Sequence, residues 1–106
     1  MATVIWTAFA QEVRREFYRS GVMTFGTLTA NKTDRKIEEI VEFLSKYPET
    51  GFPEPLLNGA KYLFRARHIN KRYKLIYRYE EANDTVYLED IWDERRNPKN
   101  LAKRIK

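Results

Sequence analysis

The chain has 106 residues, of which 42% are hydrophobic and 33% charged, and it carries a formal net charge of +5 with one histidine and no cysteine. This length suits a single domain with a modest core, so we expect residues 1–106 to form one folding unit. The absence of cysteine excludes disulfides and thiolate metal sites, and every apolar run is too short to span a bilayer. We therefore expect no metal or other cofactor, no membrane partner and a reducing cytoplasm.

A strand and a helix are predicted at the start of the chain. Residues 3–6 form a short β-prone run, and Thr7 is a suitable N-cap for a helix. The sequence 20–21, Ser-Gly, is expected to end this helix. Its apolar stripe repeats every four residues, at Phe9, Val13 and Phe17.

A second helix is predicted after a connector. Residues 22–31 are read as the connector, because Gly26 and several β-branched residues weaken the helical pattern. Either Thr33 or Asp34 is expected to cap the helix, and Pro48 closes it. The apolar face of this helix consists of Ile37, Ile40, Val41 and Leu44.

The C-terminal half predicts an antiparallel meander. After a turn-rich connection at residues 48–55, three β-prone runs occupy residues 63–69, 73–79 and 86–92. Residues 70–72 and 81–84 suit the two hairpin loops between these runs. The expected fold class is α+β. We expect a two-layer sandwich with an N-terminal strand and two helices on one face of the sheet, and with the opposite face open to solvent or a partner.

Positive charge is concentrated in the meander. Residues 61–106 hold 13 Lys and Arg against 7 Asp and Glu, whereas residues 1–60 hold 7 against 8. Because alternate side chains of a strand share a face, Arg65 and Arg67 should project together. If the strand register brings other basic residues beside them, the sheet offers a cationic patch suited to a ribose-phosphate backbone. The other interpretation is a solvated sheet face kept soluble by charge. The other basic residues are Lys74, Arg78, Arg95 and Arg96.

The order of elements and two motifs resemble a known toxin family. The motifs are the strand 73–78, Tyr-Lys-Leu-Ile-Tyr-Arg, and the stretch 91–98, Ile-Trp-Asp-Glu-Arg-Arg-Asn-Pro, with the turn at 48–51 in support. Together they resemble the RelE/ParE superfamily of type II toxins, which includes plasmid stabilisation proteins. The resemblance implies a small basic toxin neutralised by a cognate antitoxin. RelE-like members cut mRNA in the ribosomal A site without a metal, whereas ParE-like members block DNA gyrase.

Residue matching within this resemblance implies a ribosome-dependent mRNA endonuclease, with the ribosome and mRNA as partners. The four basic positions of RelE-like nucleases, which we take as the expected catalytic set, fall on Arg65, Arg67, Lys74 and Arg95. Arginine keeps its proton, so the three arginines are expected to clamp the phosphate, and Lys74 or a ribosomal group is the expected base. The C-terminal tyrosine of such nucleases has no counterpart here, which favours the alternatives: a gyrase inhibitor, or a catalytically silent relative that only binds.

Further residues have expected supporting roles. The expected RNA-binding set is Lys71, Arg72, Arg78, Arg96 and His68. The parity of His68 places it opposite Arg65 and Arg67, so a structural role and a role in the site both stay open. The carboxylates at positions 89, 90, 93 and 94 are expected to form salt bridges with the adjacent arginines, and residues 101–105 suit a short terminal helix. An acidic antitoxin segment is expected to cover the Arg65/Arg67 face or to displace the tail.

Overall fold

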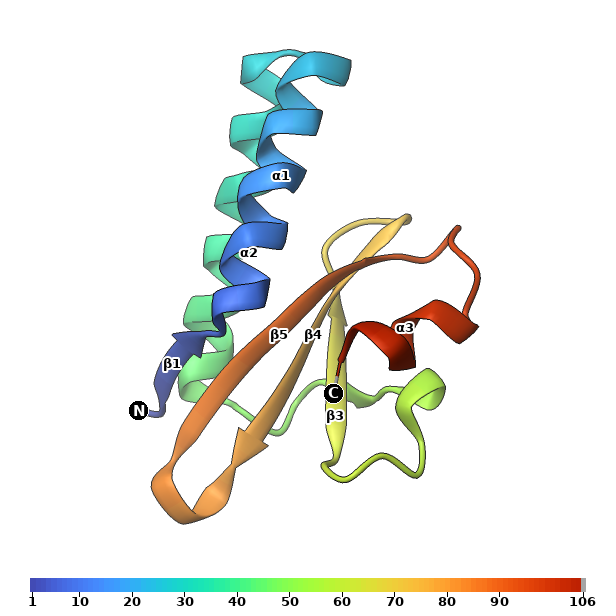
Figure 1. The fold of residues 1–106 in the computed structure, drawn as a ribbon. Coiled ribbons are helices and arrows are strands. Elements are labelled where there is room, and N and C mark those ends of the chain that lie inside the picture. The colour runs from blue at the N-terminus through green and yellow to red at the C-terminus, as the bar shows by residue number, and fades with distance from the viewer. Residues whose placement is uncertain (106) are drawn as a thin grey trace.

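The computed structural model describes residues 1–105 and contains three α-helices, five strands and two short 3₁₀ turns (Figure 1). In chain order these are β1 (Thr3–Trp6), α1 (Ala8–Phe25), α2 (Thr27–Lys46), β2 (Phe52–Pro53), η1 (Pro55–Leu57), β3 (Phe64–His68), β4 (Tyr73–Glu80), η2 (Glu81–Asn83), β5 (Thr85–Asp93) and α3 (Lys99–Arg104). The α+β class, the N-terminal strand, the meander and the short terminal helix are therefore confirmed. None of the helices in residues 1–105 is long and apolar enough to cross a membrane.

The five strands form one sheet in the order β1-β5-β4-β3-β2. β1 pairs with β5 in parallel, and the other pairs are antiparallel. A bulge in β5 interrupts its register with β4, so that Ile76 pairs with Asp90 and Tyr77 with Leu88. The prediction omitted β2, because two residues that include a proline carry no strand pattern of their own.

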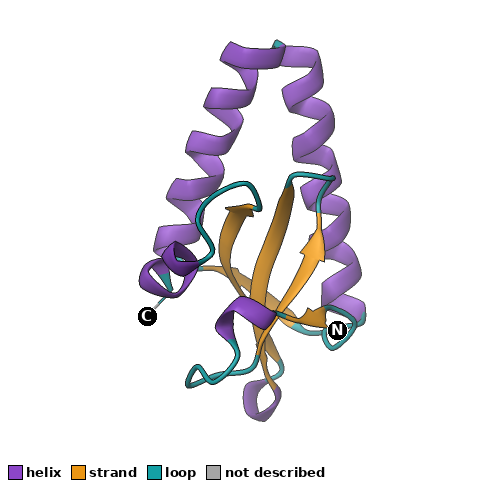
Figure 2. Ribbon diagram, turned by 90° about the vertical axis from the view of Figure 1, so that its right-hand side faces the viewer, coloured by secondary structure: helices purple, strands orange, loops and turns teal. Residues whose placement is uncertain are grey.

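The two long helices form a hairpin that projects past the end of the sheet (Figures 1 and 2). Thr7 caps α1 as predicted, since its Oγ1 accepts the Ala10 N–H at 3.1 Å. The predicted connector at residues 22–31 is wrong, because the turn needs only Gly26, whose φ of 90° lies in the left-handed region. Gly21 does not end α1; it lies within the helix and faces Ala30 of α2, where a methyl group would make only ordinary contact.

Both faces of the sheet are covered, and this corrects the expectation of an open face. The hairpin buries one face over a core that includes Ile37, Leu44, Leu75 and Leu88. On the other side, η1 and α3 pack over a second core (Figure 1). This second core consists of Leu57, Phe64, Ala66, Ile76, Trp92 and Leu101, with Ile105 against it. The short tail supplies this cover through Leu101, which is fully buried, whereas Ala102 and Lys103 on the other side of α3 are exposed.

Candidate functional site

Arg65 and Arg67 project from the face that the helices cover. In the register of β3 with β4 they lie opposite Tyr77 and Leu75, which belong to the core beneath the hairpin, so the prediction that they share a face is confirmed. Arg67 stacks on Phe43 of α2, with its guanidinium carbon 4.8 Å from the ring centroid. Both arginines are half-buried near the edge of the sheet that β2 forms.

Arg65 is engaged by the turn that leads into β2. Its Nη1 donates to the carbonyl oxygens of Glu49 at 3.0 Å and Gly51 at 2.9 Å. The buried Tyr77 holds the same turn, because its hydroxyl donates to the Pro48 carbonyl and accepts the Gly51 N–H, both at 2.8 Å. Burial raises the pKa of the Tyr77 phenol above its usual value, against a lowering by the Gly51 N–H and Arg65. Sequence reasoning missed this arrangement, since the turn is 26 residues away from Tyr77 along the chain.

Lys74 projects from the opposite face and does not join Arg65 and Arg67. It pairs in register with His68 on one side and Trp92 on the other. The period of two that puts Tyr77 beneath the hairpin turns Lys74 toward α3 and η1. Its ammonium group is buried there against Glu54, which precedes η1, at 2.8 Å from Oε1 and 2.7 Å from Oε2. The contact with Oε2 lies outside hydrogen-bond geometry, so the pair has one well-directed hydrogen bond.

His68 lies on the Lys74 face, as its parity predicted. Its Nδ1 is 3.6 Å from Glu94 Oε2, and Glu94 Oε1 is also 3.6 Å from Lys74 Nζ. The imidazole packs against Phe52, with ring centroids 5.2 Å apart. More than half of the His68 side chain is exposed, so this residue covers the outer end of a buried ion pair. Among residues 1–105, no three His, Asp or Glu side chains are grouped as metal ligands would be.

Arg95 occupies a third position, at the loop end of the sheet. Its Nε and Nη2 donate to the two carboxylate oxygens of Asp93, each at 3.0 Å, and Nη2 also lies 3.3 Å from the Tyr73 hydroxyl. The hydrogen bonds from Arg95 hold the pKa of Asp93 below its usual value. The four predicted catalytic residues are therefore divided among a helix-covered edge, a buried pair on the other face and a loop.

The expected RNA-binding residues differ in their exposure and in the contacts that their side chains already make. Arg78 is held between the rings of Tyr62 and Tyr87, at 4.3 and 4.1 Å, and its Nε donates to Glu89 at 3.0 Å. Arg96 stacks on Trp92 at 5.2 Å and is exposed. Lys71 and Arg72 are exposed in the β3–β4 loop, where they line a cleft with Arg95.

The carboxylates on and after β5 pair with arginines as expected, except Glu94. Glu89 pairs with Arg78, Asp93 with Arg95, and Glu94 with Lys74 and His68. Asp90 is fully buried and accepts two hydrogen bonds from Arg104 of α3, at 2.9 and 2.8 Å. Burial raises the pKa of Asp90, and the hydrogen bonds from Arg104 oppose that rise. This buried pair attaches the tail to the sheet.

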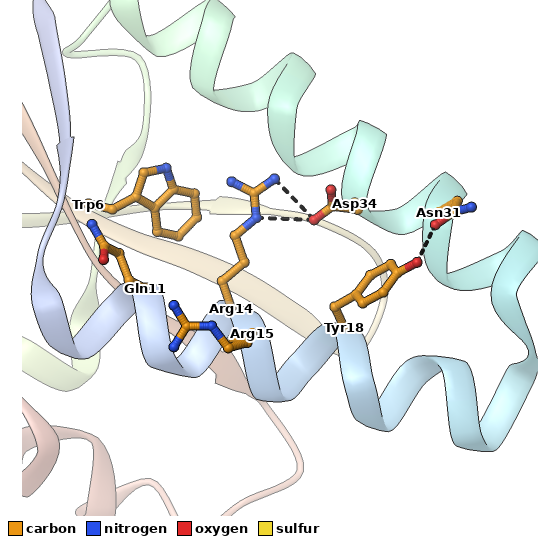
Figure 3. Close-up of a pocket in the computed structure, with 7 residues that line it drawn as sticks. All are labelled: Trp6, Gln11, Arg14, Arg15, Tyr18, Asn31 and Asp34. Atoms are coloured by element: carbon orange, nitrogen blue, oxygen red, sulfur yellow. Dashed lines mark hydrogen bonds and ion pairs between the residues drawn. The ribbon is translucent and has the colours of Figure 1, made fainter.

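A recess between α1 and α2 contains none of the predicted catalytic or RNA-binding residues (Figure 3). Arg14 stacks on Trp6 and donates from Nε to Asp34 Oδ1 at 3.1 Å, and the Tyr18 hydroxyl donates to Asn31 at 2.6 Å. Asp34 therefore serves as a bridge between the helices and not as the predicted cap. We read this recess as part of the hairpin's own packing, because its polar groups pair with each other.

The comparisons with known proteins gave one family match and several structures of the same fold. The model of the ParE toxin of the type II toxin–antitoxin system parDE matches residues 4–98. Three solved structures share the fold. The chromosomal ParDE system from P. aeruginosa has a TM-score of 0.69 at 19% identity, covering 88% of this chain and 96% of that one. A metal-bound toxin from Helicobacter pylori has a TM-score of 0.65 at 15% identity, with coverages of 90% and 97%.

The third structure is the YoeB/ParE toxin from Agrobacterium tumefaciens, with a TM-score of 0.58 at 18% identity, covering 86% of this chain and 97% of that one. No curated protein sequence matches the chain. The family match extends over nearly the whole chain, from β1 to the loop before α3. The chain therefore belongs to the ParE toxin family of type II toxin–antitoxin systems.

Proposed function

We propose that this toxin acts by binding and blocking DNA gyrase and that it does not cut RNA. The observation that supports this proposal most is the position of Lys74, whose ammonium group is buried against Glu54 on the face opposite Arg65 and Arg67. Membership of the ParE family points the same way, since gyrase inhibition is the activity that the family resemblance implies for ParE-like members.

The chemistry of RNA cleavage explains why this position matters. Attack of a ribose 2′-oxygen on the adjacent phosphate needs a base, an acid and charge stabilisation around one phosphate. Arginine stays protonated at biological pH, so it stabilises charge and does not carry protons. Lys74 was one of the two expected bases, beside a ribosomal group, and its ammonium group is buried against Glu54. A toxin that acts by binding a protein needs no such group.

The alternative is the ribosome-dependent, metal-independent mRNA endonuclease. One observation favours it: Arg65 and Arg67 do share a face, as two phosphate clamps would. In that case the base comes from the ribosome, and the chain supplies charge alone. A third function, binding without any inhibition, follows if neither target responds.

Two assays on the purified chain separate these functions. The first measures DNA supercoiling by gyrase, and the second maps mRNA 5′ ends after incubation with translating ribosomes. We expect inhibited supercoiling and no codon-positioned cuts. Cuts in the A site without inhibition would establish the nuclease, and no effect in either assay would establish the silent relative.

A matched variant sharpens the first assay. Glu54→Leu/Lys74→Met replaces the buried pair by apolar side chains of similar size, which a folded core tolerates. Because the pair is inaccessible, we expect this variant to inhibit gyrase as the parent chain does. Loss of inhibition in a variant that unfolds at an unchanged denaturant concentration would show that the pair takes part in the activity, and would remove the main support for the proposal.

The partner of the toxin follows from its family. A member of a toxin–antitoxin family has a cognate antitoxin. We place an acidic antitoxin segment on the edge formed by Arg65 and Arg67, where the guanidinium of Arg67 makes no ion pair within residues 1–105. Gyrase as the target places the action of the toxin in the cytoplasm.

A further inference from the structure

A cleft of about 530 Å³ separates the distal half of the hairpin from the loop end of the sheet. One wall carries Lys71, Arg72 and Arg95 beside Tyr73, and the other carries Ser20, Thr24, Phe25 and Thr29 of the two long helices. We infer that this cleft binds the phosphate backbone of nucleic acid. The inference goes beyond the proposed function, because gyrase inhibition by protein contact does not require it.

The basic residues of the cleft lie on two loops whose conformation is fixed by hydrogen bonds. The Glu94 N–H donates to the Arg72 carbonyl at 2.8 Å, which joins the β3–β4 loop to the loop after β5. Asn70 Oδ1 accepts the N–H groups of Arg72 and Tyr73 at 2.9 and 3.0 Å. Both loops lie at the end of the sheet toward which the hairpin projects (Figure 1). A site built this way loses little conformational freedom on binding.

The charge of this cleft is available to a ligand. Lys71 and Arg72 are exposed and form no ion pair with any carboxylate of residues 1–105, and neither does the neighbouring Arg96. Arg95 uses Nε and Nη2 on Asp93 and Tyr73, and its Nη1 has no hydrogen-bond partner in the same part of the chain. On α1, by contrast, Arg15 and Arg19 pair with glutamates of their own helix.

The facing wall fits a nucleic acid better than an acidic protein. The hydroxyls of Ser20, Thr24 and Thr29 are groups that commonly donate to phosphate and sugar oxygens. Phe25, which also lines the cleft, is 61% exposed and offers a flat surface on which a base can stack. Cations, hydroxyls and an exposed aromatic ring that line one cleft are the groups that bind a phosphate backbone with an unpaired base.

The test uses the full chain and fluorescent 20-residue oligonucleotides as duplex DNA, single-stranded DNA and single-stranded RNA. Affinity is measured by anisotropy over a series of salt concentrations. In Lys71→Gln/Arg72→Gln, we expect the slope of log affinity against log salt to shrink by about 1.8 for duplex or about 1.4 for single strands. The three oligonucleotides identify which form the cleft takes, and an added Phe25→Ala change should weaken only single-strand binding.

The control is Arg35→Gln/Lys61→Gln, which removes the same charge from exposed residues outside the cleft. An unchanged slope in the cleft variant, or an equal change in the control, would overturn the inference. The inference would also be overturned if the chain bound polyglutamate of matched charge as tightly as the oligonucleotides, since this would show a general attraction to anions. Because no gyrase is present, failure here leaves the proposed function standing, and failure in the supercoiling assay leaves this inference standing.

Discussion

Lys74 Nζ lies 2.7 Å from Glu54 Oε2, with only 6% of the lysine side chain and none of the glutamate side chain exposed. Twenty residues separate the two along the chain, and η1 brings them together over the β3–β4 part of the sheet. The lysine that residue matching assigned to catalysis is therefore part of a core. Its neighbours there include Ile76 and Trp92, on the same face of the sheet.

Breaking this pair should destabilise the protein strongly. Lys74→Met leaves the Glu54 carboxylate buried without its cation, and we expect a loss of about 3–5 kcal/mol in the free energy of unfolding. Urea denaturation followed by circular dichroism measures it. The double variant Glu54→Leu/Lys74→Met should regain most of the stability that Lys74→Met loses. A single variant as stable as the parent would show that solvent reaches the carboxylate.

The attachment of the tail by Arg104 should depend on pH. Arg104→Met removes both hydrogen bonds to the buried Asp90, and we expect it to cost about 3 kcal/mol at pH 7. Without Arg104, the already raised pKa of Asp90 rises further, and the folded state then takes up a proton that the unfolded state does not. The stability gap to the parent should therefore narrow as the pH falls from 7 toward the ordinary carboxyl value of 3.8.

Urea titrations of both proteins between pH 7 and about 4 measure this gap. Lys103→Met is the control, since Lys103 is an exposed neighbour on α3 that forms no ion pair within residues 1–105. Its stability should follow that of the parent at every pH. If the difference in stability between the parent and Arg104→Met stays constant or widens in acid, Asp90 is already solvated in the variant.

Replacing Gly51 or Gly21 by alanine should change the stability of the protein in opposite directions. At Gly51 a methyl group would lie 2.5 Å from the Tyr77 hydroxyl oxygen and 2.9 Å from the Ala66 carbonyl, so we expect Gly51→Ala to cost about 1–3 kcal/mol. At Gly21 the nearest atom, Ala30 Cβ, would be 3.6 Å away, so Gly21→Ala should stabilise α1 by about 0.5–1 kcal/mol. Thermal unfolding compares them, and a stabilised Gly51→Ala would disprove the close packing of the turn against Tyr77.

The Tyr79 hydroxyl should lose its proton at a higher pH than an ordinary tyrosine does. Its hydroxyl donates to Asp84 Oδ1 at 2.6 Å, and this hydrogen bond raises the pKa of Tyr79 to about 12. In Asp84→Asn the pKa should return toward 10, because the neutral amide no longer opposes ionisation. Asparagine also accepts the left-handed backbone at this position, where φ is 50°. Tyrosine NMR shifts followed against pH report the value, and an unchanged pKa would mean that the hydrogen bond does not persist in solution.

Charge reversal at Arg67 should weaken the antitoxin complex. Arg67→Glu places a carboxylate on the edge that we assign to an acidic antitoxin segment, and we expect at least a tenfold loss of affinity. Calorimetry of the purified pair measures it, with Arg35→Glu on the outer side of α2 as the control. If antitoxin binding and toxicity both persist in Arg67→Glu, the antitoxin lies elsewhere.

Much of this fold could be predicted from local pattern. Thr7 is a cap, residues 3–6 are a strand, and the three strands of the meander lie within a residue or two of their predicted bounds. These features follow from side-chain chemistry and spacing over a few residues. The helical hairpin was predicted less well, because α1 continues through Ser20 and Gly21 and the turn between the helices lies at Gly26.

The candidate site shows the same division. Sequence alone determined the basic block, its family resemblance and the opposite parity of His68 and Arg67, because a strand alternates its faces with a period of two. Only the tertiary structure decided which face each cation joins and which carboxylate meets it. Lys74 is buried against Glu54, whereas Lys71 remains exposed in a cleft, and that difference depends on long-range packing that no local spacing encodes.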